Sequence, residues 1–272
     1  MPELPEVETT RRGLLPRVVG ARVAALEVYD GRLRWPVPER LPGAIAGRRV
    51  VAIDRRGKYL LFRFGGDTMI VHLGMTGSLT LHDVAPARRA HDHVDLVLDG
   101  GAVVRYRDPR RFGAFLWQPA GAPSHPLLAS LGPEPFDPRF TAAYLKATLR
   151  GRRAPIKTLL MDGRVVVGVG NIYAAEALFR AGIRPSASAG RVSLPRLARL
   201  VDAVREVLAA SIEHGGTTLR DYVGSGGAPG AYQHETRVYG RAGLPCRVCG
   251  TTIRGVRLGQ RASAYCPACQ KR

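Results

Sequence analysis

The sequence predicts an α+β protein with an antiparallel β domain first, a helical domain second and a small metal-binding segment last. Three observations support this prediction. Short apolar runs separated by polar turns fill residues 21–117, apolar residues recur at helical spacing over residues 141–213, and all four cysteines follow residue 245. Strands grouped ahead of helices, without alternation along the chain, are typical of α+β proteins or of separate domains.

Two hairpin patterns define the β region. Residues 48–64 place two apolar runs around a basic turn at Arg55–Gly57, and residues 93–108 repeat this pattern around Asp99–Gly101. Repeated strands joined by short polar turns are typical of an antiparallel sandwich or barrel, and the pattern leaves both open. We expect a helix over 5–15 ahead of the strands, because acidic side chains in its first turn suit the positive end of a helix.

The second half of the chain reads as helical. A proline-rich run without periodicity, residues 118–139, is expected to connect it to the β region. Beyond this run, apolar residues at helical spacing predict four helices whose apolar faces form a core. These helices are Thr141–Leu149, Pro155–Met161, Asn171–Ala181 and Ser193–Glu213. Residues 222–235, which are rich in glycine, predict a mobile loop.

The charge of the chain is strongly positive. Lys and Arg number 41 and Asp and Glu number 22, so the formal net charge is 41 − 22 = +19. Self-repulsion of this size opposes folding and favours a polyanionic partner, of which nucleic acid is the leading candidate. A general arginine-rich composition, or a need for solubility, would account for the same charge.

The distribution of apolar and cysteine residues excludes several classes of protein. Residues 1–13 are charged and lack the apolar segment of a secretory signal. The most apolar stretch, residues 165–179, contains Asn171 and Glu176 and falls short of a membrane span. Cysteines confined to one end of the chain argue against the disulfide framework of a secreted domain. We therefore expect a soluble cytoplasmic protein without a membrane partner.

The four cysteines have the spacing of a metal site. Cys246, Cys249, Cys266 and Cys269 form the pattern C-x₂-C-x₁₆-C-x₂-C. Four thiolates in two such pairs suit tetrahedral zinc, and the spacer between the pairs is long enough for a hairpin. Two disulfides or four free thiols are the alternatives. The segment has few apolar residues, so we expect one structural zinc ion to supply its folding free energy.

The N-terminus carries a possible nucleophile. Pro2 follows the initiator methionine and is small enough to permit removal of Met1, which would expose a secondary amine. An α-amino group titrates near pH 8, so a useful fraction is unprotonated at neutral pH. Condensed with an aldehyde carbon, such an amine gives a cationic iminium that promotes elimination, and Glu3 beside it could move protons. The alternative is that Pro2, Glu3 and Pro5 simply begin a helix.

Ten short motifs, in order along the whole chain, resemble those of bacterial formamidopyrimidine-DNA glycosylases, bifunctional enzymes that remove oxidised purines from DNA. The motifs are PELPEVET (2–9), GKYL (57–60), HLGMTG (72–77), HDHVD (91–95), DPRRFG (108–113), LGPEP (131–135), GVGNIYA (168–174), GGTTL (215–219), VYGR (238–241) and the four-cysteine segment with GQRA (259–262). The resemblance implies a β-sandwich domain with an N-terminal helix, a helical domain with a helix–two-turn–helix motif, and a zinc-bound β-hairpin. We place these at residues 1–130, 131–240 and 241–272.

The resemblance also assigns catalytic roles. Pro2 would attack sugar C1′ and form a Schiff base, and Glu3 would act as proton donor. Lys58 would assist base removal and β-elimination, and Arg261 would grip a phosphate beside the lesion and assist δ-elimination. Without the resemblance, Lys58 would be read as an ordinary turn lysine.

Further residues would contact damaged double-stranded DNA, the implied partner of a monomeric enzyme. Lys157 and Asn171 would hold the phosphate backbone, and Met75, Arg110 and Phe112 would enter the space left by the extruded nucleotide. His91, Arg110 and Arg152 would make further contacts with the DNA. Each has a structural alternative: Asn171 as a helix cap, Arg152 as a solvated charge, His91 as a hydrogen-bonded sheet residue, Met75 and Phe112 as core. Because HLGMTG and DPRRFG contain glycine and resemble turns, we expect exposed loop tips.

Two rival functions differ in substrate or in chemistry. An enzyme of the endonuclease VIII type shares the Pro-Glu start and the finger but prefers oxidised pyrimidines; the motifs PELPE, HLGMTG and DPRRFG favour the purine enzyme. A non-catalytic, zinc-dependent DNA-binding protein would explain the charge and the finger but not Pro2 and Glu3 together with Lys58. Residues 222–235 match the family less closely, and they lie where these enzymes cap the extruded base.

Overall fold

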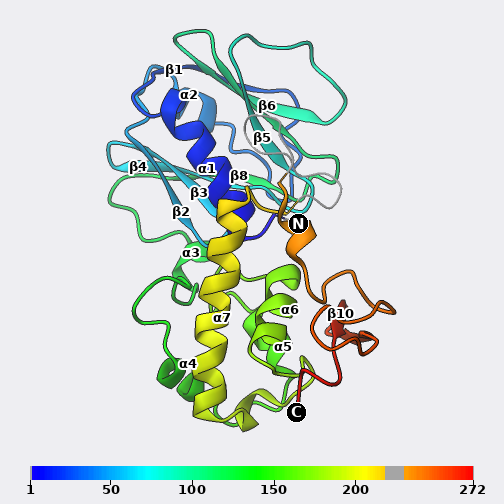
Figure 1. Cartoon of the computed structure of the whole chain (residues 1–272). Coiled ribbons are helices and arrows are strands. Elements are labelled where there is room, and N and C mark those ends of the chain that lie inside the picture. The colour runs from blue at the N-terminus through cyan, green and yellow to red at the C-terminus, as the bar shows by residue number, and fades with distance from the viewer. Residues whose placement is uncertain (1, 218–229, 272) are drawn as a thin grey trace. The chain divides into compact units, whose positions relative to one another are not determined.

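The computed structural model describes residues 2–217 and 230–271 and separates into two compact units (Figure 1). The first unit comprises Met1–Ala129 and Ile212–Gln233, and the second comprises Ser130–Ser211 and His234–Arg272. Within the part of the chain that is described, no helix is both long and apolar enough to cross a bilayer.

The first unit contains two four-stranded antiparallel sheets. One has the order β1-β6-β7-β5 and the other β2-β3-β4-β8. The strands are β1 (Val23–Val28), β2 (Ala52–Arg56), β3 (Tyr59–Phe64), β4 (Asp67–His72), β5 (Ser78–His82), β6 (Asp92–Leu98), β7 (Val103–Arg107) and β8 (Ala114–Gln118). Helices of this unit are α1 (Leu4–Val18), α2 (Leu41–Ile45) and α3 (Pro126–Ala129).

The two sheets pack face to face, so the sandwich is confirmed and the barrel alternative was wrong. Alternate residues of β3, such as Leu60 and Phe62, join Leu96 and Val104 of the other sheet in one buried cluster. Leu61 points to the opposite face and belongs to a different cluster. This alternation is the period of two that a half-buried strand requires.

Both predicted hairpins are present, with one correction of register. The β6–β7 hairpin turns at Asp99–Gly101, as expected. In the β2–β3 hairpin, however, Arg55 and Arg56 pair with Leu60 and Tyr59 and belong to strand β2. The turn therefore lies at Gly57 and Lys58. Gly57 has a φ of 57°, a conformation that glycine adopts without steric cost.

The four predicted helices are confirmed to within two residues at each end. They are α4 (Ala142–Leu149), α5 (Ile156–Leu160), α6 (Asn171–Arg180) and α7 (Leu194–Glu213), with short 3₁₀ turns η1 (Ala189–Arg191) and η2 (Tyr232–Glu235). The apolar face of α7 is buried as expected. The C-terminal segment forms the hairpin of β9 (Arg254–Leu258) and β10 (Arg261–Tyr265).

Two loop predictions fare differently. Residues 118–139, which were expected to connect the two regions without regular structure, contain the short helix α3. Of the predicted mobile loop, residues 222–229 lie outside the described residues. The prediction was wrong for its end, because Tyr232 begins the 3₁₀ turn η2 and is buried, with its ring centroid 6.2 Å from that of His214.

Candidate functional site

The start of α1 fixes Pro2 and Glu3 through a buried carboxylate. Pro2 is buried, and Glu3, which is 2% exposed, occupies the N-cap position of the helix. The Glu3 backbone N–H donates to Oε2 of Glu6 at 2.7 Å, which satisfies one of the donors that a helix N-terminus leaves open. Glu6 is itself 2% exposed, so this bond is shielded from water and holds the direction in which the chain enters the helix.

The same carboxylate anchors a second segment of the first unit. Oε1 of Glu6 accepts the backbone N–H of Thr217 at 2.7 Å. Gly216 has a φ of 86°, and a Cβ added there would lie 3.1 Å from Oε1 of Glu6, so the approach suits glycine. Thr217 also forms a β-bridge with Ala231. Glu6 therefore ties the Pro2–Glu3 start to the two ends of the segment that follows α7.

Lys58 lies at the tip of the β2–β3 hairpin, which an arginine braces. Arg55 donates from Nη1 to the Gly57 carbonyl at 3.0 Å and from Nε to Oε2 of Glu8 at 3.1 Å. Glu8 belongs to α1, so the brace links the Lys58 turn to the helix that begins at Pro2 and Glu3. Although burial raises the pKa of Glu8, hydrogen bonds from Arg11 and Arg12 lower it to about 2, which keeps the brace charged at neutral pH.

His72 lies close to Lys58 at the end of β4. Burial lowers the pKa of His72 to about 4, and the positive charges of Lys58 and Arg34 act in the same direction. The imidazole is therefore neutral at physiological pH. Its Nδ1 accepts the backbone N–H of Gly74 at 3.1 Å, which shapes the start of the HLGMTG loop.

A buried carboxylate joins the HLGMTG and DPRRFG loops. Asp108 is fully buried, and its Oδ1 accepts from the Thr76 hydroxyl at 2.6 Å and from the Arg110 N–H at 3.3 Å. Its Oδ2 accepts from the Tyr106 hydroxyl and from the Gly113 N–H, each at 2.9 Å. Burial and the charge of Asp108 raise the pKa of Tyr106, so its hydroxyl remains a donor. Four donors from two loops and a strand thus converge on one side chain.

The side chains that these loops present differ in exposure. Phe112 is 39% exposed and Arg110 is exposed, with the guanidinium carbon 4.7 Å from the Phe112 ring centroid. Met75 is half-buried. A Cβ at Gly74 would lie 2.4 Å from the Phe112 carbonyl carbon, so the two loops are in direct backbone contact. The alternative that Phe112 is a core residue was wrong. Met75 is neither a core residue nor a fully exposed one, because its side chain is half-buried.

Two histidines of the HDHVD motif have different surroundings. His91 is exposed with a φ of 74°, and its carbonyl accepts the Asp108 N–H at 3.0 Å. His93 is buried, and its Nε2 lies 2.9 Å from the Asp108 carbonyl. His93 is therefore a buried, hydrogen-bonded sheet residue, whereas the structural alternative for His91 was wrong, because His91 precedes β6 and presents its ring to solvent.

In the second unit, a buried lysine joins α5, α6 and the C-terminal hairpin. Lys157 is 1% exposed, and its Nζ donates to Oδ1 of Asn171 and to Oγ of Ser263, each at 2.7 Å. A longer contact of 3.4 Å reaches the carbonyl of Ala262, the residue after Arg261. Arg261 is exposed at the start of β10. Lys157, Asn171 and the backbone beside Arg261 therefore form one cluster.

Asn171 is not the cap of its helix, because Gly170 occupies the N-cap position of α6 and Asn171 is the first helical residue. Arg152 is exposed and lines a separate hollow of about 530 Å³ together with Arg153, Ser188 and Arg191. The lining of that hollow does not include Lys157 or Asn171. The structure thus groups two of the three predicted contacts on the helical part of this unit.

The four cysteines converge as a metal site requires. All four sulfur atoms lie within 4.8 Å of one another, and none of the cysteines forms a disulfide. The Sγ atoms of Cys249 and Cys266, and of Cys249 and Cys269, are 3.5 Å apart, and those of Cys246 and Cys269 are 4.0 Å apart. A tetrahedron with metal–sulfur bonds of about 2.3 Å has edges of about 3.8 Å. The residues present fit a tetrahedral thiolate site.

Several side chains that organise the site escaped the sequence analysis. Glu6 could have been found, because Glu3 and Glu6 have the three-residue spacing of a capping box. Glu8, Asp108 and Ser263 were not singled out, because the contacts that join separate segments are distant in sequence. Glu8 and Asp108 also bond to sequence neighbours, but their contacts with Arg55 and Thr76 span 47 and 32 positions. Ser263 accepts from Lys157 across 106 positions.

Comparison with known protein families matches three segments of the chain. Residues 1–115 match the formamidopyrimidine-DNA glycosylase N-terminal domain, residues 131–223 match the formamidopyrimidine-DNA glycosylase H2TH domain, and residues 243–272 match a zinc finger found in FPG and IleRS. Formamidopyrimidine-DNA glycosylases of Methylococcus capsulatus and Burkholderia vietnamiensis are each 57% identical to the chain, over its full length and theirs.

Solved structures agree with these matches. The MutM (Fpg) protein of Thermus thermophilus superposes with a TM-score of 0.88 at 42% identity and covers 99% of this chain and 98% of its own. The Lactococcus lactis Fpg in complex with DNA containing an abasic site gives 0.90 at 33% identity, with coverage of 99% and 100%. Taken with the sandwich, the H2TH segment and the four-cysteine hairpin, these matches show that the chain belongs to the formamidopyrimidine-DNA glycosylase family.

Proposed function

We propose that this chain is a DNA glycosylase of base excision repair that removes oxidised purines, including 8-oxoguanine and formamidopyrimidines, from double-stranded DNA. One observation carries the proposal: within a full-length family match, the Pro2–Glu3 start is fixed by the buried Glu6. A relative of known structure binds DNA containing Fapy-dG, which supports this substrate class.

The proposed reaction begins with Pro2, once Met1 has been removed. The nitrogen of Pro2 attacks C1′, the bond from C1′ to the base breaks, and the base leaves with a proton. Glu3 supplies a proton to O4′, the C1′–O4′ bond breaks and opens the sugar ring, and the nitrogen of Pro2, having lost its own proton, forms a cationic iminium with C1′. The iminium acidifies C2′–H. Loss of that proton breaks the C3′–O bond (β-elimination), and a second elimination breaks the C5′–O bond (δ-elimination). The lyase activity that we propose is therefore a consequence of the same covalent intermediate.

Reaching C1′ requires the nucleotide to leave the duplex. Enzymes that act on a base extrude it at a cost of a few kcal/mol and fill the space with side chains. We assign this task to Met75, Arg110 and Phe112, of which Arg110 and Phe112 are exposed and stacked on each other. Arg110 would read the opposite base with its fixed donors. Asn171, His91 and Arg152 would contact phosphates, and Lys157 would help to hold the phosphate backbone through Asn171, to which its buried Nζ donates. Lys58 and Arg261 would act beside the lesion.

The four cysteines would hold one zinc ion, which fixes the hairpin that carries Arg261. Because all four ligands are thiolates, the ion would have no open position for substrate and would be structural. We further propose a cytoplasmic monomer organised as residues 1–130, 131–240 and 241–272.

Base release on two duplexes tests the proposal. One carries 8-oxoguanine opposite cytosine and the other an oxidised pyrimidine, thymine glycol, opposite adenine. We expect faster release of 8-oxoguanine, and loss of this release with retained DNA binding in Glu3→Gln, which keeps the shape but not the titrating group. Faster release of thymine glycol would indicate an enzyme of the endonuclease VIII type. Binding without release from either duplex would indicate a non-catalytic DNA-binding protein.

A further inference from the structure

The segment between β5 and β6, residues 83–91, is a basic arm on the first unit. It carries Arg88, Arg89 and His91, all exposed, against one acid, Asp83, which pairs with Arg17 at 2.8 Å. Helices and strands are not found in this described segment. Val84 is 79% exposed, so burial of apolar side chains does little to hold the arm in place.

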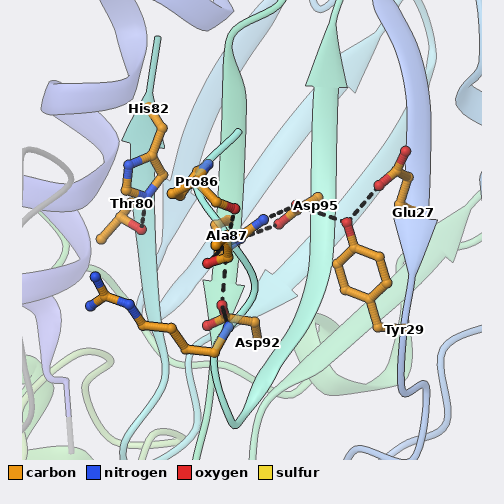
Figure 2. Close-up of polar contacts among 10 residues, drawn as sticks. Glu27, Tyr29, Thr80, His82, Pro86, Ala87, Asp92 and Asp95 are labelled. Carbon is orange, nitrogen blue, oxygen red and sulfur yellow. Dashed lines mark hydrogen bonds and ion pairs between the residues drawn. The ribbon is translucent and has the colours of Figure 1, made fainter. Parts of the chain in front are cut away.

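A buried arginine beneath the arm holds the arm by hydrogen bonds to its backbone. Arg105 of β7 is 4% exposed and donates from Nε and Nη2 to the two carboxylate oxygens of Asp95, at 2.8 and 2.6 Å. This two-point contact fixes the plane of the guanidinium. Nη1 then points to the arm and donates to the Pro86 carbonyl at 2.8 Å, with a further contact of 3.3 Å to the Ala87 carbonyl. Figure 2 shows Pro86, Ala87, Asp92 and Asp95 gathered around this centre.

Further contacts attach the same network to the cationic end of the arm. Nη1 of Arg105 lies 3.3 Å from Oδ2 of Asp92, and this oxygen accepts the Arg89 N–H at 2.8 Å. The Arg88 guanidinium lies 4.3 Å above the Tyr29 ring, and the Tyr29 hydroxyl is bonded to Asp95 at 2.9 Å. The backbone on both sides of Arg88 is thereby tied to one buried group.

Stability is a poor explanation for this arrangement. Removing three charges from water is costly, and well-packed apolar residues often replace buried ion pairs with no loss of stability. The planar guanidinium of Arg105 directs its donors toward a carboxylate and toward two carbonyls, and an apolar residue has no donors to direct. The geometry of the arm is therefore the property that depends on Arg105.

We propose that Arg105 is a positioning residue for duplex binding, and that the arm it holds places Arg89 against the DNA phosphate backbone beside His91. The inference rests on the proposed DNA substrate and adds two residues to its binding surface. Arg89 contributes affinity through charge, and Arg105 contributes by keeping Arg89 and His91 in one conformation, which lowers the entropy lost on binding.

The test is a double-mutant cycle on Arg89→Ala and Arg105→Lys. Arg105→Lys keeps the buried charge but loses the planar fork. The readouts are the Kd for a duplex that carries a tetrahydrofuran abasic analogue, as a function of salt, and the single-turnover rate of 8-oxoguanine excision at saturating enzyme. One phosphate contact changes affinity by about eightfold at 0.1 M salt, and the change disappears toward 1 M. We expect this behaviour for Arg89→Ala.

Arg105→Lys should weaken binding by about tenfold at 0.1 M salt, with the saturating rate within about twofold of the wild type. In that background Arg89→Ala should have little further effect, because the arm is already displaced. Arg63→Lys is the matched control: Arg63 also pairs with an aspartate, Asp54 at 2.8 Å, but on strand β3 and away from the arm. It should leave binding unchanged.

Additive effects of the two changes, or an unchanged Kd in Arg105→Lys, would overturn the inference. If Arg105→Lys does not fold, Asp92→Asn replaces it in the cycle, since Asp92 joins Arg105 to the Arg89 backbone. Binding and excision are measured separately, so the two proposals fail separately. Duplex binding without excision contradicts the proposed function, whereas excision with an insensitive Kd contradicts the role of Arg105.

Discussion

The β-sandwich and the C-terminal hairpin hold their exposed arginines by different means. In the sandwich, Arg110 lies on a loop whose backbone is bonded to the buried Asp108, above a core that both sheets share. In the hairpin, Arg261 lies on a strand whose buried cluster is small and includes Cys246 and Cys266 themselves. The first arrangement is stabilised by the whole unit, whereas the second has little apolar surface to bury, so we expect it to depend on a metal ion held by the four cysteines. The two regions should therefore respond differently to the same kind of damage.

Breaking the cysteine site should give the largest effect. Cys266→Ser removes one of four thiolates, so we expect loss of zinc, disorder of the hairpin and a fall in DNA affinity of more than about 100-fold, since structural zinc supplies on the order of 10 kcal/mol of folding free energy in isolated fingers. The sandwich should melt as in the wild type. Metal content, DNA binding and thermal unfolding are measured on one preparation. Arg261→Ala should retain zinc and lose less affinity; unaltered DNA binding by zinc-free protein would contradict this view.

Asp108→Asn is the corresponding change in the sandwich. The amide would place an N–H group against the Gly113 or Arg110 N–H, leaving a buried donor without an acceptor, and we expect about 2 kcal/mol lower stability. Urea denaturation measures this difference. The exposed Asp54→Asn, which also removes a carboxylate, should change the free energy of unfolding by less than about 0.5 kcal/mol. Equal effects of the two changes would show that Asp108 does not hold the loops.

Phe112→Ala should affect excision of the lesion while leaving the stability of the sandwich almost unchanged. Phe112 is 39% exposed, so truncation should change stability by less than about 0.5 kcal/mol. Excision from an intact lesion duplex should fall by about tenfold or more, while cleavage at a pre-formed abasic site is better retained, because unstacking costs a few kcal/mol only in the intact duplex. Single-turnover rates on both substrates decide this. A parallel loss on both would assign Phe112 to the chemistry instead.

The effect that is smallest at neutral pH, and that develops only in acid, is a pH dependence of stability centred on His72. The folded-state pKa of about 4 lies below the ordinary value of 6.5, so the unfolded chain binds a proton first as the pH falls. The contribution of neutral His72 to stability is thus present above pH 6.5 and is lost between pH 6.5 and 4, at up to about 1.4 kcal/mol per pH unit. His72→Gln should flatten this part of the profile, and the exposed His91→Gln should not. Identical profiles for all three proteins would exclude His72 as the cause.

Local sequence patterns predicted most of the fold. They could not predict contacts between residues that lie far apart in the sequence. The β6–β7 hairpin and the four helices follow from periodicity and turn residues. The β2–β3 turn was misplaced because Arg55 and Arg56 look like turn residues, although both pair with strand β3 and the Arg55 side chain braces Glu8. The burial of Lys157 was not predictable, since its acceptor Ser263 lies 106 positions away. Phe112 could be expected at a loop tip, but the hydrogen bond that the Thr76 hydroxyl donates to Asp108, 32 positions away, could not.

The central claim is that Pro2 becomes covalently attached to DNA, and borohydride trapping tests it most directly. The protein is incubated with a duplex carrying 8-oxoguanine opposite cytosine, reduced with borohydride and digested, and the peptide that carries the adduct is identified by mass spectrometry. We predict an adduct on Pro2, and in Pro2→Gly a loss of most trapping and strand cleavage, because the primary amine that remains is a poorer replacement. An adduct on Lys58, or complete base release without any trapped species, would contradict the claim.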